Sequence, residues 1–305
     1  FTLPKSAGLL IYISQIMGKI YNDSRKVIIW TKLITKQIDS FAIISKDSDM
    51  TAAKSAINIA KKFTRSGFHV KLISPLISKH FDTVSISDNL SDSNIKCIIV
   101  VGGDGTILKT VRLMKQQIPI LGINFGGRGI LTELTPVEIS KAIEKIKHGE
   151  IFFDRRKRIK LFLNSNKSVS ALNEVYIERY KKLRSSYFEI YLDSYKLKQK
   201  MDGLIISTPT GSTGHALSLG SSILNENLSA LMLTPIAPIS RIPPFALPLM
   251  DISIIPNDDA YVIVDGQVEF QIKAHNKISI KKHNSDTIFL RFDNSPIRQL
   301  NKFGF

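Results

Sequence analysis

A buried apolar strand that runs into glycines and then into a helix is the feature that most limits how this chain folds. The run is Val100-Val101-Gly102-Gly103-Asp104-Gly105-Thr106, and the apolar residues Ile107, Leu108, Val111 and Met114 follow at helical spacing. Glycines let the backbone turn tightly and approach a ligand closely. The amides and the dipole of a helix start favour phosphate oxygens. The run therefore predicts a strand–loop–helix unit whose loop residues Gly102, Gly103 and Thr106 hold a phosphate donor.

The segments around this unit alternate between strand and helix patterns. We expect strands at 41–45, 69–73, 98–101 and 119–124, and a helix over 49–65 with the apolar residues Ala52, Ala53, Ala56, Ile59, Ala60 and Phe63 at helical spacing. Such alternation is typical of a parallel sheet covered by helices. The predicted fold of residues 41–150 is an α/β, Rossmann-like domain that carries the glycine loop.

The pattern changes near Gly149 to short segments that often alternate between apolar and polar residues. They cover 159–163, 169–177, 187–192, 204–207, 261–264 and 268–272. Short alternating segments separated by Asn, Asp, Ser or Gly favour antiparallel strands, while the prolines between Pro235 and Pro248 exclude regular structure over most of that stretch. We expect a β-rich, sandwich-like domain over 151–305, whose C-terminal tail returns to the first domain, and an extension of unknown role at 1–40.

Composition excludes several classes of protein. Cys97 is the only cysteine, which excludes an internal disulfide and a cysteine-based zinc cluster, and none of the six histidines has a metal-ligand spacing. The net charge of +16 attracts polyanions, but the basic residues are scattered and no nucleic-acid motif is recognisable. No segment reaches the ~18 apolar residues of a membrane span. We expect a cytoplasmic protein with no nucleic-acid or membrane partner and no fixed metal site.

Asp104 is the candidate catalytic residue because it projects from the glycine loop. A carboxylate there can bind magnesium or take a proton from an attacking hydroxyl, and its alternative role is an N-cap of the helix. The loop is neither a Walker motif, since no Gly-Lys-Ser/Thr follows, nor a Rossmann Gly-x-Gly-x-x-Gly.

Three further motifs carry polar or glycine-rich chemistry. The segment 122–129 holds four glycines after a strand, and Asn173-Glu174 is a polar pair inside an apolar β run. The segment 202–220, Asp-Gly-Leu-Ile-Ile-Ser-Thr-Pro-Thr-Gly-Ser-Thr-Gly-His-Ala-Leu-Ser-Leu-Gly, is dense in hydroxyls and glycine. Such groups suit the sugar, phosphates and base edges of a nucleotide.

Taken in order, these motifs resemble the NAD kinase family from about Phe41 to about Phe292. Gly-Gly-Asp-Gly-Thr is shared with diacylglycerol and sphingosine kinases, whereas the Asn-Glu pair followed by 202–213 is specific to NAD kinases. The resemblance implies transfer of a phosphoryl group from ATP, another nucleoside triphosphate or polyphosphate, with Mg²⁺, to the 2′-hydroxyl of the adenosine ribose of NAD, giving NADP. It implies Asp104 as the general base and a homodimer or homotetramer.

The resemblance also implies a set of NAD-binding residues. Asn173 and Glu174 would hold the adenosine part, and Asp202 with Lys200 would lie by the nicotinamide riboside. The remaining members of the set are Gly105, Lys109, Arg184, Thr213, Gly214, His215, Ser218 and Gln267. The family often has Ala-Tyr where this chain has Gly214-His215, so imidazole replaces an aromatic contact.

Two alternative functions remain open from the residues themselves. A lipid or sphingoid kinase would share the glycine–aspartate loop but would not need Asn173-Glu174 or the 208–218 segment. A catalytically silent nucleotide-binding regulator would not need Asp104.

Overall fold

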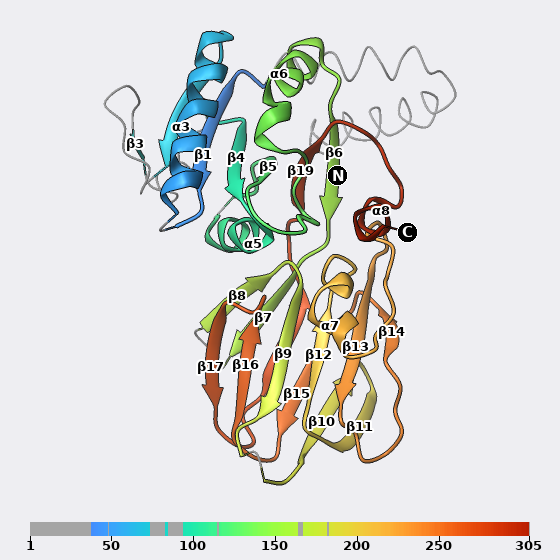
Figure 1. The fold of residues 1–305 in the computed structure, drawn as a ribbon. Coiled ribbons are helices and arrows are strands. Elements are labelled where there is room, and N and C mark those ends of the chain that lie inside the picture. The colour runs from blue at the N-terminus through green and yellow to red at the C-terminus, as the bar shows by residue number, and fades with distance from the viewer. Residues whose placement is uncertain are drawn as a thin grey trace, which may run out of the picture.

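The computed structural model describes residues 38–47, 49–73, 83–84, 94–114, 116–163, 167–181 and 183–304. Most of the predicted extension 1–40 therefore lies outside the described residues. Figure 1 shows two stacked parts, an α/β domain above and a β-sandwich below, with the C-terminal helix α8 beside their junction. Among the described residues no helix has the length and apolar character to cross a membrane.

A seven-stranded sheet forms the α/β domain in the order β3-β2-β1-β4-β5-β19-β6. Its strands are β1 (Ser40–Ser45), β2 (His69–Ile73), β3 (Thr83–Val84), β4 (Cys97–Gly102), β5 (Ile120–Asn124), β6 (Phe152–Arg156) and β19 (Thr287–Arg291). Neighbouring strands run parallel except β6, which runs antiparallel to β19. The chain thus changes sheet between Arg156 and Ile159, and its C-terminal part re-enters the first sheet through β19.

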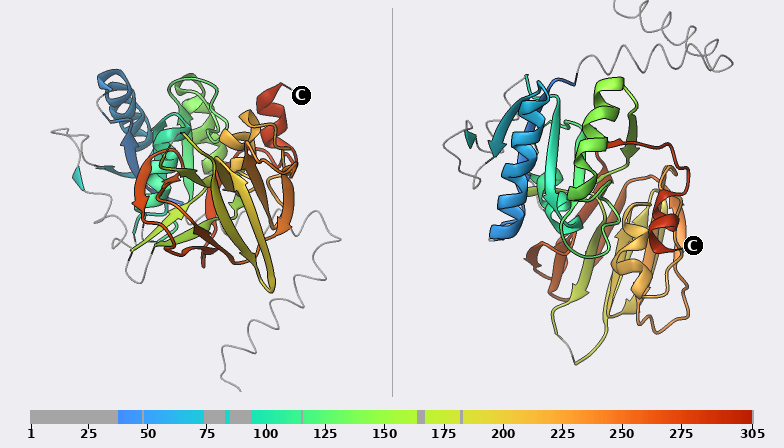
Figure 2. Two further views of the ribbon diagram at one scale, coloured as in Figure 1. Left: turned by 90° about the horizontal axis from the view of Figure 1, so that it is seen from below. Right: turned by 45° about the horizontal axis from the view of Figure 1, so that its top comes forward.

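Helices cover both faces of this sheet, as Figure 2 shows. Helices α3 (Met50–Arg65) and α6 (Ile139–His148) pack on the face that carries Phe41 and Ile43, while α5 (Asp104–Leu113) packs on the face that carries Ala42 and Ile44. Successive side chains of a strand point to opposite faces, so a strand covered on both faces must be apolar throughout. This explains why every residue of β1 and β4 is buried.

Helix α3 forms where its sequence pattern predicts. Asp49 accepts hydrogen bonds from the amides of Thr51 and Ala52 and so caps the helix start. The buried face carries the alanines, Ile59 and Phe63, and Phe63 meets Phe41 edge-on at 4.8 Å between ring centroids. The helix ends before Gly67, whose φ of +91° lies in the region that favours glycine.

The sandwich consists of two six-stranded antiparallel sheets whose facing sides form one core. One sheet has the order β11-β10-β15-β18-β7-β8 and the other the order β14-β13-β12-β9-β16-β17. The strands are β7 (Ile159–Leu163), β8 (Lys167–Ala171), β9 (Glu174–Arg179), β10 (Ser186–Leu192), β11 (Tyr195–Met201), β12 (Gly203–Ser207), β13 (Ala230–Ile236), β14 (Phe245–Pro248), β15 (Ile252–Pro256), β16 (Ala260–Val264), β17 (Val268–Ile272) and β18 (Ile278–Lys282). The predicted fold class, α/β followed by a β-rich sandwich, is confirmed.

One local prediction differs from the structure. The single strand expected over 169–177 is wrong, because β8 ends at Ala171 and β9 begins at Glu174. The proline-rich stretch is irregular over 237–244, which is most of 235–248, as predicted, and β14 follows at the edge of its sheet. An edge strand tolerates proline because one side of it has no ladder to complete.

Leu121 on β5 tests the central packing of the α/β domain. Its side chain is fully buried in the core beneath α3 and α6. We expect Leu121→Ala to lower the free energy of unfolding by about 2–5 kcal/mol, through lost apolar burial and the cavity left behind. The control is Leu183→Ala, since Leu183 is 97% exposed. Denaturant unfolding with equal losses in both variants would contradict this packing.

Candidate active site

A pocket lies where the order of the parallel strands reverses. β1 and β4 are neighbours, and the chain continues from β1 outward to β2 and β3 but from β4 to β5 on the other side. Ligands of open α/β sheets bind at the carboxyl ends of strands at such a point. The pocket has a volume of about 820 Å³. It is lined by residues at or after the ends of β1, β4 and β5, namely Ser45, Lys46, Asp47, Gly103, Gly105, Thr106, Phe125, Gly126 and Gly127, and by Lys109 on α5.

The glycine loop joins β4 to the first turn of α5. A Cβ at Gly102 would lie 2.5 Å from Thr106 Oγ1, so the close packing of this turn requires glycine. A Cβ at Gly103 would meet nothing within 4 Å, and Gly103 precedes α5 in extended backbone conformation. The open space beside Gly103 belongs to the pocket. The start of a ten-residue helix therefore lies at a pocket large enough for phosphates.

Asp104 joins the two glycine-rich loops. Its Oδ2 accepts a hydrogen bond from the Ile130 amide and its Oδ1 one from the Leu131 amide, both at 2.9 Å. These residues directly follow the loop Gly126–Gly129, of which Gly126 and Gly127 line the pocket. Each carboxylate oxygen has two lone pairs, so the amides leave each oxygen able to accept another hydrogen bond. Asp104 thus holds the second loop and keeps capacity for a ligand.

Lys109 lines the same pocket as the glycine loop 102–106, the predicted phosphate-donor site, and does not lie beside Asn173 and Glu174. Its Nζ forms an ion pair with Asp47, which follows β1. Both side chains are about half exposed and both line the pocket. Ser45, Lys46 and Asp47 were not among the site residues predicted from the sequence. The signal that could have indicated them is the polar run Ser-Lys-Asp-Ser-Asp, which begins at the last residue of the predicted strand 41–45.

Asn173 and Glu174 lie at the break between β8 and β9. Asp265 creates this break, because its carboxylate accepts hydrogen bonds from the amides of Leu172, Asn173 and Glu174 at 2.8–3.1 Å. The carbonyl of Asn173 instead accepts from the Thr208 amide at 2.8 Å. Amides that bind a side chain are not available to the strand ladder. Leu172 and Asn173 therefore lie between the strands, and Glu174 begins β9 opposite Ser207 of β12.

Glu174 and Asp265 form a buried pair of carboxyl groups, 6% and 5% exposed. Burial and the nearby charge of Asp265 raise the pKa of Glu174 to about 8. Burial also raises the pKa of Asp265, against the three amides that favour its charged form. Those amides make Asp265 the better site for the negative charge, so Glu174 holds the proton of the pair at neutral pH and can donate a hydrogen bond.

The residues of the segment 208–218 that approach Asn173 and Glu174 most closely are glycines, whereas several hydroxyls of the segment bind its own backbone. A Cβ at Gly211 would lie 2.1 Å from the carbonyl oxygen of Asn173, and one at Gly214 would lie 3.3 Å from Glu174 Oε2. Several hydroxyls bind the segment itself: Ser212 Oγ donates to the Pro209 carbonyl at 2.7 Å, and Thr213 Oγ1 to that of Thr210 at 3.1 Å.

The short helices η2 (Gly211–Thr213) and α7 (His215–Ser218) present the rest of this segment. His215 and Ser218 are exposed, and the His215 ring lies 5.5 Å from that of Tyr176 on β9. Asn173, Glu174, Gly214 and His215 therefore form one cluster. Tyr176 lies beside this cluster and was not among the predicted site residues.

Asp202, Lys200 and Arg184 lie elsewhere in the same chain. Asp202 binds Arg179 at 2.8 Å, and this ion pair holds the pKa of Asp202 below its usual range. Arg179 is the last residue of β9 and Glu174 the first, so this group is about 17 Å from the Asn-Glu pair at ~3.4 Å per residue. Lys200 stacks on Tyr187 at 5.6 Å, and Arg184 is exposed on the loop before β10. The structure does not bring these three residues to the cluster within one chain.

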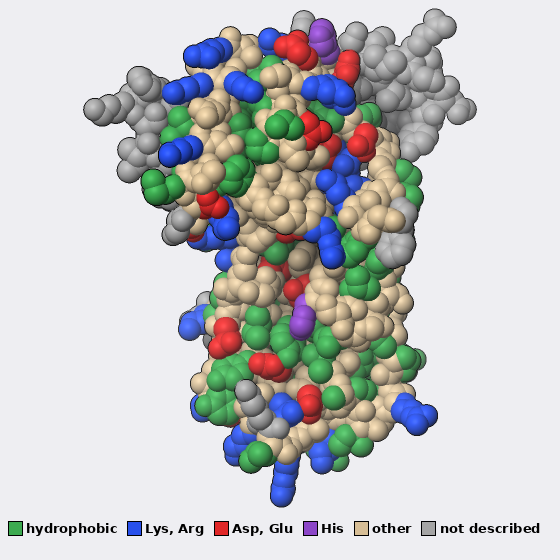
Figure 3. All heavy atoms as spheres, in the orientation of Figure 1, with side chains coloured by type: hydrophobic (Ala, Val, Ile, Leu, Met, Phe, Trp, Pro, Cys, Tyr) green, Lys and Arg blue, Asp and Glu red, His purple; other side chains and the backbone are tan. Residues whose placement is uncertain are grey.

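Gln267 connects the sandwich to the α/β domain. Its Nε2 donates to the Gly105 carbonyl at 2.7 Å, and its Oε1 accepts from Arg112 at 2.6 Å. Gln267 follows Asp265 by two residues, so this turn holds the Asn-Glu cluster against the helix that begins at Asp104. Figure 3 shows that the surface narrows where these two parts of the molecule meet and that Lys and Arg side chains are spread over both parts.

Two family models match the chain. Residues 28–151 match the ATP-NAD kinase N-terminal domain and residues 172–292 the ATP-NAD kinase C-terminal domain. An NAD kinase of Thermococcus sibiricus is 36% identical over 220 residues, which are 70% of this chain and 80% of that protein. An NAD kinase of Pyrococcus furiosus is 30% identical over 260 residues, 83% of this chain and 94% of that protein.

Two solved structures are similar to this chain. An NAD kinase from Archaeoglobus fulgidus in complex with ATP has a TM-score of 0.69 and 27% identity, over 87% of this chain and 97% of that chain. Yeast NADH kinase complexed with NADH has a TM-score of 0.79 and covers 88% of this chain and 86% of that chain. At 21% identity the yeast structure supports the fold alone.

The raised pKa of Glu174 predicts a pH-dependent stability. Its usual pKa of 4.5 and its folded value of about 8 bracket a range in which the folded state binds an extra proton. The free energy of unfolding therefore falls as pH rises through this range and levels off above it. Glu174→Gln removes this slope because glutamine does not titrate, so we expect the stability of wild type relative to the variant to fall steadily from pH 5 to pH 8.5.

The matched control is Glu189→Gln. Lys196 and its neighbours lower the pKa of Glu189, so that residue stays charged throughout pH 5–8.5. Denaturant unfolding of the three proteins at several pH values makes the comparison. If the difference in the free energy of unfolding between wild type and Glu174→Gln does not change with pH, Glu174 is charged in the folded state.

Proposed function

This chain belongs to the NAD kinase family of enzymes, and on that premise we propose that it transfers the terminal phosphoryl group of ATP to the 2′-hydroxyl of the adenosine ribose of NAD, giving NADP. The observation that carries the proposal is the contact of Gln267 with Gly105. It sets the Asn-Glu cluster of the sandwich beside the helix start that borders the α/β pocket. Two substrates bound at these places would meet near Asp104.

The pocket at the ends of β1, β4 and β5 is the proposed donor site. The start of α5 and the loop 126–127 offer backbone amides to phosphate oxygens. Lys46 and Lys109 add positive charge on the side of β1. The ATP complex of the Archaeoglobus fulgidus relative supports ATP as donor. Polyphosphate is the alternative donor, and nothing in the pocket itself selects against it.

Magnesium fits this pocket as an ion that the donor brings with it. Within the described ranges no three His, Cys, Asp or Glu side chains gather to hold a metal. Asp47 lines the pocket with one carboxylate, and Thr106 lines it as well. Mg²⁺ usually takes one or two carboxylates with phosphate oxygens and water, so Asp47 would supply a protein ligand. The ion would neutralise negative charge on the phosphates.

Asp104 is the proposed general base. The 2′-oxygen of the ribose attacks the terminal phosphorus, the bond to the leaving ADP oxygen breaks, and the hydroxyl proton passes to the Asp104 carboxylate. The amides of Ile130 and Leu131 hold this carboxylate in one orientation. Such a reaction depends mainly on positioning and on neutralising phosphate charge.

The Asn-Glu cluster is the proposed site of the adenosine part of NAD. Protonated Glu174 would donate a hydrogen bond to an acceptor of the nucleoside, and Asn173 would supply an amide. His215 and Tyr176 offer ring faces for stacking beside them. Thr213 and Ser218 belong to the same segment. Roles of Arg184, Lys200 and Asp202 in NAD binding, a homodimer or homotetramer, and a cytoplasmic location stay predictions.

The decisive experiment incubates the purified full chain with NAD, Mg²⁺ and either ATP or polyphosphate and measures NADP. We expect NADP with at least one donor, and a parallel reaction with NADH tests the choice of acceptor. Absence of NADP with every donor would overturn the proposed function. The lipid-kinase alternative predicts that outcome together with phosphorylation of a lipid hydroxyl.

The role of Asp104 has its own test. We expect Asp104→Asn to lower kcat by about 10²–10⁴-fold, the usual contribution of a general base, with the KM values for ATP and NAD little changed. A rise in KM for ATP with kcat retained would assign Asp104 to holding the 126–129 loop instead. Asp251→Asn is the control, because Asp251 is an exposed surface residue paired only with Lys281 among the described residues. Full activity of Asp104→Asn would contradict a base at this position.

A further inference from the structure

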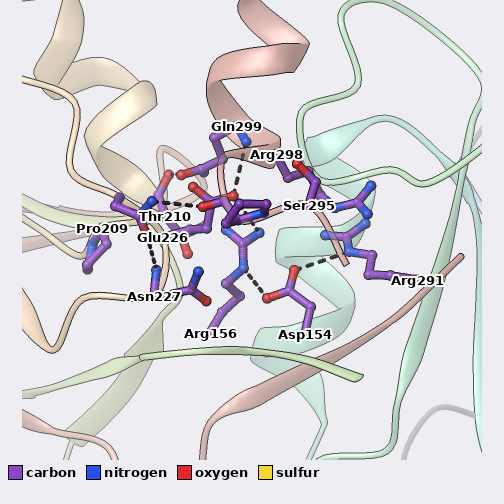
Figure 4. A network of polar contacts seen from close by, with 12 residues as sticks. Asp154, Arg156, Pro209, Thr210, Glu226, Asn227, Arg291, Ser295, Arg298 and Gln299 are labelled. Atoms are coloured by element: carbon purple, nitrogen blue, oxygen red, sulfur yellow. Dashed lines mark hydrogen bonds and ion pairs between the residues drawn. The ribbon is translucent and has the colours of Figure 1, made fainter. Parts of the chain in front are cut away.

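The C-terminal helix α8 (Arg298–Phe303) contacts both sides of the proposed site, although no motif of the sequence pointed to it. Arg298 and Gln299 are buried, at 7% and 1% exposure. Figure 4 shows both side chains within a network of polar contacts that joins α8 to the α/β domain and to the segment Pro209–Thr210. Resting on the proposed function, we propose that α8 positions the NAD-binding segment 210–214 relative to Asp104, with Gln299 as the positioning residue for NAD.

Gln299 holds the NAD-binding segment directly. Its Nε2 donates to the Thr210 carbonyl at 3.0 Å and lies 3.3 Å from Thr213 Oγ1. Its backbone amide donates to Glu226 Oε1 at 3.1 Å. Thr210 and Thr213 flank Gly211, which lies against Asn173. A shift of Gln299 would therefore move the backbone that packs on the Asn-Glu pair.

Arg298 ties the same helix to the Asp104 side. It forms a buried ion pair with Glu133 at 2.8 Å, and Glu133 also pairs with Arg291 at 3.3 Å. Arg291 Nη1 donates to the Leu131 carbonyl at 2.9 Å. The amide of Leu131 is one of the two that bind Asp104. A continuous path of polar contacts thus runs from the Asp104 carboxylate through α8 to the NAD-binding segment.

The last turn of α8 reaches the donor side of the pocket. The Arg128 guanidinium lies 4.9 Å from the centre of the Phe303 ring, a cation–π contact. Arg128 belongs to the loop whose Gly126 and Gly127 line the pocket. The first turn of α8 therefore contacts the acceptor side and its last turn the donor side.

The charged side chains along this path are buried, which makes them hard to displace. Glu133 is 4% exposed and Arg291 1%, so their charges lie out of water. Removing one partner of such a pair leaves the other charge buried and uncompensated, which is strongly unfavourable. The ion pairs of Arg298 therefore hold the start of α8, and with it Gln299, in one place. Because the start of α8 is held in place, the neutral side chain of Gln299 can keep the segment 210–214 in position.

Gln299→Met tests the acceptor side. Methionine keeps the length and the apolar stem of glutamine, so the fold should survive the exchange. We expect the KM for NAD to rise about tenfold, with the KM for ATP within twofold of wild type. A merely structural role would lower the thermal midpoint and the active fraction, and so kcat, without moving KM. Asn301→Ala is the control, since Asn301 lies on the exposed side of α8 and bonds to Ser295.

Phe303→Leu tests the other end of the helix and is independent of Gln299. Loss of the contact with Arg128 should raise the KM for ATP about two- to fivefold, as expected for ~0.5–1 kcal/mol, and leave the KM for NAD unchanged. Wild-type KM values for both substrates in both variants would overturn the inference. Failure of the wild-type protein to make NADP would instead overturn the proposed function, so the two failures are distinguishable.

Discussion

The candidate site depends on one buried carboxylate at the point where the chain passes from one sheet of the sandwich to the other. Asp265 accepts hydrogen bonds from the amides of three successive residues, Leu172, Asn173 and Glu174, between the end of β8 and the start of β9. It adopts a φ of +50°, which aspartate tolerates better than most side chains. β8 and β9 belong to different sheets, so these hydrogen bonds hold the chain where it crosses between them. Asn173 and Glu174 thereby lie together beside the glycines of the 208–214 segment.

The same turn determines where the sandwich meets the α/β domain. Asp265 shapes the Asn-Glu pair, and Gln267, two residues later, binds Gly105 and Arg112 of α5. Leu172 completes the junction by packing in the core beneath α5. The Asn-Glu cluster and the start of α5 are therefore positioned by neighbouring residues of one β-turn. A change in this turn would alter both the cluster and its distance from Asp104.

Buried ion pairs at the junction of the two domains fix the positions of β6, β19 and α8 more than they add to the free energy of unfolding. Arg156 and Arg291 are each 1% exposed, and both bind Asp154, at 2.6 and 3.2 Å. Desolvating such groups offsets much of their mutual attraction. They cannot shift without leaving a charge unpaired, so β6, β19 and α8 keep one arrangement. This rigidity suits phosphoryl transfer, in which a small misplacement of the reacting groups lowers the rate strongly.

Local patterns in the sequence determined the elements and the chemical character of the site. The continuous apolar runs of β1 and β4, the amphipathic helix 50–65 and the Gly-Gly-Asp-Gly turn each report a constraint between near neighbours along the chain. They were sufficient for the α/β and β-rich fold class and for Asp104, Asn173 and Glu174 as candidates. The strand break at 172–173 could not be predicted, because its cause lies about ninety residues away in Asp265.

Which of the predicted site residues lie close together depends on the tertiary structure. Lys109 lines the pocket beside the glycine loop and Gln267 contacts α5. Arg184, Lys200 and Asp202 lie toward the end of β9 that is far from Glu174. Helix α8 carries no recognisable motif, yet Arg298 and Gln299 reach both sides of the site. These relations depend on hydrogen bonds and ion pairs between residues far apart in the chain, and such contacts leave no periodic signal in either segment. Local sequence patterns therefore identify the chemical groups of the candidate site, whereas contacts between distant segments set how those groups are placed relative to one another.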